Sequence, residues 1–164
     1  MKRVLLDTNI YGRIVEKREE GEVKVLIEKR PDILGYGLDV VRKELRDVSK
    51  ESREKRRLRI TLLALYDGIT KAHIYLTTAA IRQLACEYYK AYQRLGGTKT
   101  EKEIANDFLI VSCASIHEMD VVASENRKTM LSKEARMAYD IVNALRNYRT
   151  PVFTNYQQFR RLFS

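Results

Sequence analysis

Short apolar runs alternate with longer amphipathic stretches along the whole chain. Predominantly apolar runs, typical of strands buried in a parallel sheet, cover residues 4–6, 33–38, 74–76, 120–123 and 151–153. Helical spacing of apolar positions predicts helices over roughly 9–29, 39–67, 78–95, 100–116 and 132–148, followed by a terminal helical turn. Because strands and helices alternate, we predict an α/β fold with a central parallel sheet and helices on both faces.

The sequence also predicts where the helices begin or break and which face of the last long helix is buried. Gly21 is the expected break in the first helical region, since glycine lowers helix stability. Asp39 is expected to cap the helix after the second strand, and Thr77 or Thr78 the helix after the third. The last long helix is expected to bury one apolar face, made of Ala138, Ile141, Val142, Leu145 and Tyr148.

Length and composition favour one folded domain. A chain of 164 residues that is 45% hydrophobic predicts a single domain over residues 1–164. The apolar stretch before Asp7 has only three residues, too few for a secretory signal, and no run approaches the roughly 20 apolar residues of a membrane span. Cys86 and Cys113 lack paired spacing and are expected to be buried, reduced thiols. Together these features predict a cytoplasmic protein without a membrane segment.

The net charge of +9 is unevenly distributed. Residues 42–59 carry nine basic and four acidic side chains, and residues 127–164 carry eight and two. Residues 1–41 carry eight of each, and residues 60–126 carry six basic and eight acidic side chains. Two basic segments of this kind attract phosphate backbones such as those of nucleic acids. A solvated helix face, or a surface for an acidic protein segment, would explain the same charge.

Asp7 ends the first predicted strand. Ligands of parallel α/β sheets bind beyond the carboxyl ends of the strands, so this position favours a functional role. A buried carboxylate also needs a cation or hydrogen-bond donors. The alternative is that Asp7, with Thr8 and Asn9, caps the helix that follows.

Two more acids and one polar segment occupy comparable positions. Glu44 lies one helical turn after the second strand, near apolar neighbours, although a surface glutamate paired with a cation would look the same. Asp107 lies near the start of an almost wholly apolar helix, where it is either a metal ligand or a complement to the helix dipole. Residues 124–126, Ser-Glu-Asn, follow the fourth strand and are either site residues or a capping loop.

Histidine and cysteine give no sign of a metal site. His73 and His117 are far apart and lack the spacing of zinc ligands, so we expect both to be structural. Carboxylate oxygens are instead the ligands that hard divalent ions prefer. No glycine-rich phosphate loop follows the first strand, which disfavours a generic nucleotide- or phosphate-binding domain.

Four segments together resemble the PIN-domain nucleases. They are L-L-D-T-N-I at the first strand, V-V-R-K-E-L after the second, N-D-F-L-I-V-S-C-A in the apolar helix and V-V-A-S-E-N at the fourth strand. The terminal T-P-V-F-T-N-Y-Q-Q-F also resembles the closing strand and helix of that family. The segments occur in the family's order, and the resemblance spans nearly the whole chain.

The resemblance implies a three-layer α/β/α sandwich and an acidic catalytic cluster. Asp7, Glu44 and Asp107 would bind Mg²⁺ or Mn²⁺, and Thr8, Asn9 and Ser124 would support them or hold water. The family's fourth acid comes two residues after a Ser or Thr, where this chain has Asn126. Glu125 is adjacent but is expected to point elsewhere. We therefore expect one firmly held ion and a second that is weak or arrives with the substrate.

The function implied by the resemblance is a metal-dependent endoribonuclease. Many small single-domain members, of the VapC type, are toxins that form homodimers and are silenced by a small antitoxin. The expected partners are thus RNA, an antitoxin and a second copy of the chain. An RNA-processing nuclease is one alternative, and a catalytically weak or inactive PIN-like module that binds RNA or protein is another, supported by Asn126.

Overall fold

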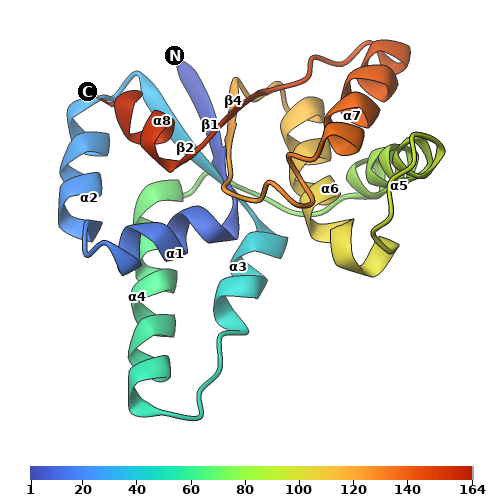
Figure 1. The fold of residues 1–164 in the computed structure, drawn as a ribbon. Coiled ribbons are helices and arrows are strands. Elements are labelled where there is room, and N and C mark those ends of the chain that lie inside the picture. Colours follow the sequence, from blue (N-terminus) through green and yellow to red (C-terminus); the bar gives the residue numbers. More distant parts are fainter. Residues whose placement is uncertain (164) are drawn as a thin grey trace.

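A five-stranded parallel sheet forms the centre of the molecule (Figure 1). In the computed structural model, which describes residues 1–163, the strand order is β3-β2-β1-β4-β5. The central strand β1 pairs with β2 and β4, so that Leu5 lies opposite both Tyr36 and Val122. The strands are β1 (Lys2–Leu6), β2 (Ile33–Leu38), β3 (Ile74–Tyr75), β4 (Val121–Ala123) and β5 (Val152–Thr154). All five predicted strands are therefore present.

Helices cover both faces of the sheet and complete the predicted three-layer α/β/α fold (Figure 1). The first group is α1 (Thr8–Glu16), α2 (Glu20–Lys29), α3 (Asp39–Arg46) and α4 (Arg53–Thr70). The second group is α5 (Ala79–Arg94), α6 (Glu101–Ile116) and α7 (Lys133–Arg146), while the short α8 (Tyr156–Arg161) follows β5. Within residues 1–163, none of these helices combines the length and apolarity needed to cross a membrane.

The helix boundaries differ from the prediction at two places. The first helical region breaks at residues 17–19, because Arg18 adopts a left-handed conformation (φ 57°). The amides of Arg18 and Glu19 donate to carbonyls of the last turn of α1, which closes the helix in a Schellman motif. Gly21 lies inside α2, so the expected break there was wrong. Asp39 is the first residue of α3, and its side chain accepts hydrogen bonds from Val40 and Thr77.

Close packing of α4 on β2 depends on a glycine. A Cβ added at Gly37 would lie 2.6 Å from Cζ of Tyr66 and 2.9 Å from Cγ2 of Thr70, both in α4. The Tyr66 hydroxyl reaches past this point and donates to the carbonyl oxygen of Leu38 (3.0 Å). Since Leu38 ends β2 and leads directly into α3, this contact fixes the place where α3 leaves the sheet.

The buried face of α7 is not the one predicted. Ala138 and Val142 are buried as expected, but Ile141 is 45% exposed and Leu145 80% exposed, with Tyr148 exposed as well. The buried side is centred on Tyr139, whose ring packs edge-on against aromatic rings of α5 and α6. These large rings offer more contact area than the aliphatic stripe, so the aliphatic stripe faces outward.

The two cysteines differ in burial. Cys113 in α6 is buried, as predicted, and burial raises its pKa to about 12. Cys86 in α5 is exposed, so the expectation that both are buried was wrong. Its side of the helix lies opposite the buried stripe that includes Leu84 and Tyr88.

Candidate active site

The carboxyl ends of β1 and β4 meet at the point where the strand order reverses. From β1 the chain proceeds first to β2 and β3 on one side, and later to β4 and β5 on the other. Such a switch point leaves an open edge where ligands bind in parallel α/β sheets. Asp7 follows β1 and Ser124 follows β4, and the Ser124 hydroxyl donates to Oδ2 of Asp7 (2.7 Å). The first predicted site residue therefore lies where the topology favours a ligand.

Asp7 caps α1 and faces the site at the same time. Its Oδ1 accepts from the backbone amide of Thr8 (2.7 Å), which is the capping role considered as the alternative. Its Oδ2 accepts from the side-chain amide of Asn9 (2.6 Å) as well as from Ser124. The carboxylate is only 4% exposed, and all three of these donors are neutral. Capping and site function are thus compatible for this residue.

The other two acids approach the same edge from different elements. Glu44, on α3, accepts hydrogen bonds from the hydroxyl of Thr8 and from the side-chain amide of Asn106. Asp107, on α6, is 8% exposed and accepts from the hydroxyl of Thr129. Thr8 thereby links Asp7 and Glu44, while α6 presents Asn106 and Asp107 side by side. The structure brings all three predicted acids to one region.

The electrostatics of the site show uncompensated negative charge. The pKa of Asp107 is raised to about 7, chiefly by burial and also by the nearby charges of Asp7 and Glu44, while the Thr129 hydrogen bond opposes the rise. Burial also raises the pKa of Asp7, while the hydrogen bonds from Ser124 and Thr8 oppose the rise and the charge of Glu44 adds to it. Within residues 1–163, no lysine or arginine forms an ion pair with any of these three acids.

The residues that follow β4, 124–126, point to different neighbours. The backbone amide of Asn126 donates to the Ser124 hydroxyl (3.0 Å), and its side-chain amide donates to Oδ2 of Asp107 (3.2 Å). Glu125 turns away, as expected, because its carboxylate accepts from the backbone amide of Tyr156 at the start of α8 (2.9 Å). Its own amide donates to the Asn9 side chain (2.9 Å). Asn126 therefore stands beside Asp107 as a neutral donor where the family resemblance implies an acid.

Two residues of this site were not predicted from the sequence. Asn106 and Thr129 each hold one of the acids by a side-chain hydrogen bond. Asn106 directly precedes Asp107, and this adjacency was a usable signal. Thr129 lies in the loop between β4 and α7, where no local pattern indicates its direction.

The side chains do not form a ready-made coordination shell. No group of three or more His, Cys, Asp or Glu side chains within residues 1–163 is arranged to hold a metal ion. The reason is visible in the hydrogen bonds, since Glu44 and Asp107 direct their oxygens toward separate neutral donors. Glu44 is close enough to raise the pKa of both Asp7 and Asp107, and Asp7 is close enough to raise that of Asp107, but the three carboxylates do not converge on one point.

The two histidines lie at a different part of the sheet. The ring of His117 stacks on Tyr75 with 3.7 Å between centroids, and His73 packs against Tyr36 at 5.1 Å. Both occupy the side of the sheet where β2 and β3 lie. Their packing agrees with the structural role predicted for them.

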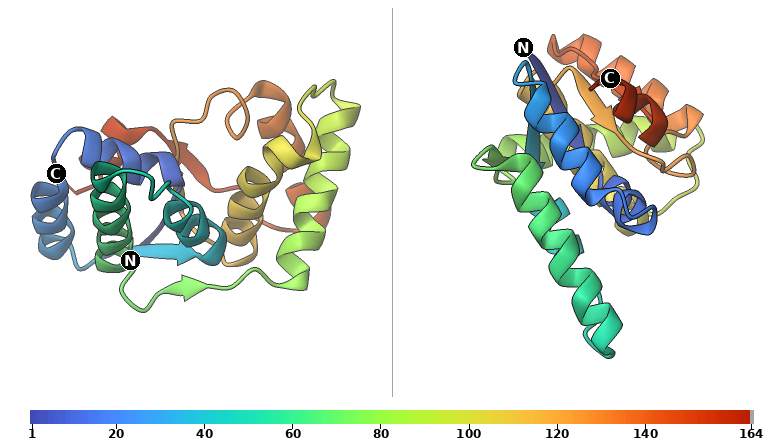
Figure 2. Two further views of the ribbon diagram at one scale, coloured as in Figure 1. Left: turned by 90° about the horizontal axis from the view of Figure 1, so that it is seen from below. Right: turned by 90° about the vertical axis from the view of Figure 1, so that its left-hand side faces the viewer.

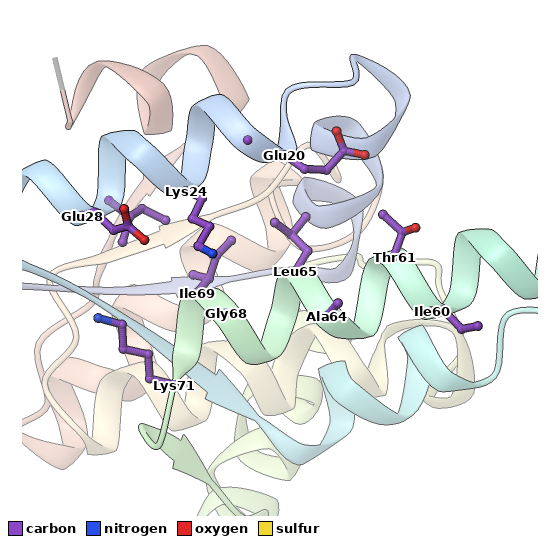
Figure 3. Close-up of a pocket in the computed structure, with 12 residues that line it drawn as sticks. Glu20, Lys24, Glu28, Ile60, Thr61, Ala64, Leu65, Gly68, Ile69 and Lys71 are labelled. Carbon is purple, nitrogen blue, oxygen red and sulfur yellow. The ribbon is translucent and has the colours of Figure 1, made fainter.

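A separate groove lies between α2 and α4, away from the acids (Figure 3). Its volume is about 510 Å³. Leu65 and Ile69 of α4 and Ile27 of α2 supply apolar surface, and Lys24 and Glu28 of α2 lie at its edge (Figure 3). This groove is apolar and contains none of the predicted site residues.

The chain is an α/β/α protein with three acids at the carboxyl edge of its parallel sheet. No protein-family model and no curated protein sequence matches the chain. Solved structures do, and the chain resembles VapBC2 from Rickettsia felis bound to a DNA fragment from its promoter, with TM-score 0.61 and 16% identity over 93% of this chain and 98% of that one. DNA-bound VapBC from Salmonella typhimurium matches with TM-score 0.62 and 12% identity over 95% and 99% of the two chains. FitAcB from Neisseria gonorrhoeae matches with TM-score 0.57 and 17% identity over 81% and 93%. At these identities, the similarity establishes the VapC-like fold.

Proposed function

We propose that the protein is a metal-dependent endoribonuclease that acts as the toxin of a toxin–antitoxin pair. One observation carries the enzymatic part: Asp7, Glu44 and Asp107 lie in one region at the switch point, and no lysine or arginine of the described residues forms an ion pair with them. Buried carboxylates that lack a cation are costly, so a bound cation would relieve the repulsion.

The residues at the site fit a hard divalent ion such as Mg²⁺ or Mn²⁺. All candidate ligands are oxygens, which these ions prefer, and both histidines are elsewhere. Asp7, Glu44 and Asp107 would hold the ion once the carboxylate of Glu44 turns from Thr8 and Asn106, and that of Asp107 from Thr129, toward it. Such an ion activates water and neutralises charge on a phosphodiester.

The surrounding residues would position these acids. Ser124 and Asn9 hold Oδ2 of Asp7 in place, so the carboxylate keeps its direction whether or not an ion is bound. Thr8 couples Asp7 to Glu44 across the gap between β1 and α3. Because Asn126 supplies an amide where a fourth acid would stand, we propose that one ion binds firmly.

The test is RNA cleavage with a matched charge control. Purified wild type is incubated with labelled RNA and Mg²⁺ or Mn²⁺, beside Asp7→Asn and beside Asp140→Asn, which removes an exposed acid on α7. Wild type and Asp140→Asn should cleave the RNA, and Asp7→Asn should not. Equal survival of the RNA in all three samples, with both metals, would refute the enzyme. RNA binding without cleavage would then favour the inactive binding module.

The antitoxin is proposed from the structural neighbours and from the groove. The similar structures are VapBC and FitAcB proteins, and a protein partner of this chain would need apolar surface to bury. The groove between α2 and α4 offers it, with Ile60 at one end 68% exposed. We propose that an antitoxin segment docks there.

Co-expression with the product of an adjacent short gene tests this partner. Ile60→Glu should prevent co-purification, whereas Ile141→Glu, at another exposed isoleucine, on α7, should not. Co-purification that survives Ile60→Glu would exclude the groove. Light scattering on the same samples measures whether the protein forms the proposed homodimer.

A further inference from the structure

The start of α4 and the loop before it project away from the rest of the molecule (Figure 2). We name residues 46–59, from the end of α3 through the loop into α4, the basic arm. In the right-hand view of Figure 2, α4 extends well beyond the sheet at its amino-terminal end. The helix has 18 residues and is thus about 27 Å long at about 1.5 Å per residue. Seven of these residues, 53–59, belong to the arm and span about 10 Å, and all of them but Arg59 are exposed, so the arm is not part of the core.

The basic arm carries positive charge that the protein leaves largely unpaired. It contains seven basic side chains, Arg46, Lys50, Arg53, Lys55, Arg56, Arg57 and Arg59, and three acids, Asp47, Glu51 and Glu54. Lys55–Glu51 is the one ion pair of the arm within the described part of the chain. The Arg56 guanidinium donates to a backbone carbonyl instead of an acid (3.0 Å). Six cations and two acids thus remain without an ion pair.

The position of these cations on α4 is unfavourable for the helix itself. Ser52 caps the helix, and Arg53, Lys55, Arg56 and Arg57 follow within its first turns. The amino-terminal end of a helix carries partial positive charge and repels cations. Arg53 also lies three and four residues before Arg56 and Arg57, at spacings where like charges repel. Stability alone does not explain this arrangement, but an anionic ligand would relieve both kinds of repulsion.

We propose that the basic arm binds the phosphate backbone of an RNA chain and holds it next to the carboxylate cluster. This inference rests on the RNA-cleaving function proposed above. Glu44 of the cluster and Arg46 of the arm lie two residues apart on α3. An open hollow of about 870 Å³, lined by Arg46, Arg59 and Lys50 among others, occupies the bend between α3 and α4. Guanidinium groups bind phosphate oxygens in bidentate fashion, and five of the seven cations are arginines.

RNA binding in the absence of cleavage tests the arm. Asp7→Asn protein in EDTA is titrated into a fluorescein-labelled 20-nucleotide RNA of mixed sequence, with and without R53Q/R56Q/R57Q, at several salt concentrations. At low salt, the triple variant should bind the RNA about tenfold more weakly or worse. The slope of log K against log salt concentration should become shallower by about two. Three phosphate contacts are lost, and each contact on a single strand contributes about 0.7 to that slope.

A second triple variant controls for net charge. R82Q/K90Q/R94Q removes three exposed cations from α5 and should change the affinity less than twofold. The arm side chains are exposed, so R53Q/R56Q/R57Q should melt no lower than its parent protein. R53K/R56K/R57K, which preserves the charge, should retain most of the binding even if the glutamine variant misfolds.

The outcomes distinguish a failure of the arm proposal from a failure of the nuclease proposal. Equal losses in the two glutamine variants, or no loss in the arm variant, would overturn the proposal. So would a labelled poly-glutamate peptide that binds the arm more tightly than RNA, because the arm would then fit an acidic protein. If the arm variant loses RNA binding while wild type cleaves nothing, the nuclease fails and the arm stands. If wild type cleaves RNA and the arm variant has the same KM, the arm fails and the nuclease stands.

Discussion

The buried carboxylate of Asp107 should make the metal-free protein less stable as the pH rises. Burial, with the added charges of Asp7 and Glu44, raises the pKa of Asp107 from its ordinary 3.8 to about 7. Between these values, the folded state holds a proton that the unfolded chain has released. The stabilisation is complete below about pH 4 and is lost as the pH rises through about 7.

The magnitude follows from the two pKa values. At about 1.36 kcal/mol per pH unit, the interval from 3.8 to about 7 corresponds to about 4 kcal/mol. Asp107→Asn removes the ionisation and keeps an oxygen that can accept the hydrogen bonds from Thr129 and Asn126. Between pH 5 and pH 8, its unfolding free energy should therefore rise relative to that of wild type by about 3 kcal/mol.

Urea denaturation in EDTA at pH 5, 6, 7 and 8 measures the difference in unfolding free energy, here called the gap, between Asp107→Asn and wild type. Asp140→Asn, at an exposed position, removes one acid without changing the site, so its gap to wild type should stay constant with pH. Mn²⁺ at about 100 times its Kd should restore about 2.7 kcal/mol to wild type at pH 8 and much less to Asp107→Asn. A gap for Asp107→Asn that does not change with pH would refute the claim that this carboxylate is desolvated and uncompensated.

Three further substitutions test the site and the fold. Asn126→Asp supplies the missing fourth acid and should raise the number of Mn²⁺ ions bound in calorimetry from one to two; a count that stays at one would contradict the role given to this position. Ser124→Ala removes one of the two side-chain donors to a buried carboxylate oxygen of Asp7 and should lower the unfolding free energy by about 1–3 kcal/mol, while Ser112→Ala, which removes a buried hydroxyl without a partner within residues 1–163, should cost much less. Gly37→Ala should destabilise by about 1–3 kcal/mol through its clash with α4, while Gly12→Ala in α1, with open space around it, should stabilise by about 0.5–1 kcal/mol in thermal or urea unfolding.

The central strands and the placement of Asp7 and Asp107 could be predicted because their signals are local, whereas Glu44 was placed with them only by the family resemblance. The apolar run before Asp7 and the run from Ile33 to Leu38 are too apolar for anything but buried strands, and the structure has both. Once two parallel strands are known, their carboxyl ends share an edge, and Asp7 falls there. Asp107 was recognisable as an acid within the apolar part of α6, beyond the acids of its first turn.

The remaining features depend on contacts between distant segments. Ile141 and Leu145 point outward because the face of the same helix that carries Tyr139 is buried instead. Hydrophobic periodicity alone does not show which of two apolar faces is buried. The break at Arg18 requires a left-handed residue that no sequence rule favours for arginine. Thr129 reaches Asp107 only because the loop after β4 folds back over α6.

The neutral surroundings of the acids are the strongest argument that this site is meant for a cation. Elsewhere the chain pairs its acids with arginine: Arg42 with Asp67, and Arg146 with Glu87, whose pKa is lowered by that contact. With 31 basic residues available, a stable fold could place one beside Asp7 or Asp107. The site instead uses hydroxyl and amide donors, which orient carboxylates without neutralising them. An arginine there would hold the acids permanently and exclude a metal ion, whereas neutral donors leave the charge available. Without a metal ion, the buried negative charge lowers the stability of the folded state. The pH dependence of Asp107→Asn therefore tests the proposed function as well as the stability of the fold.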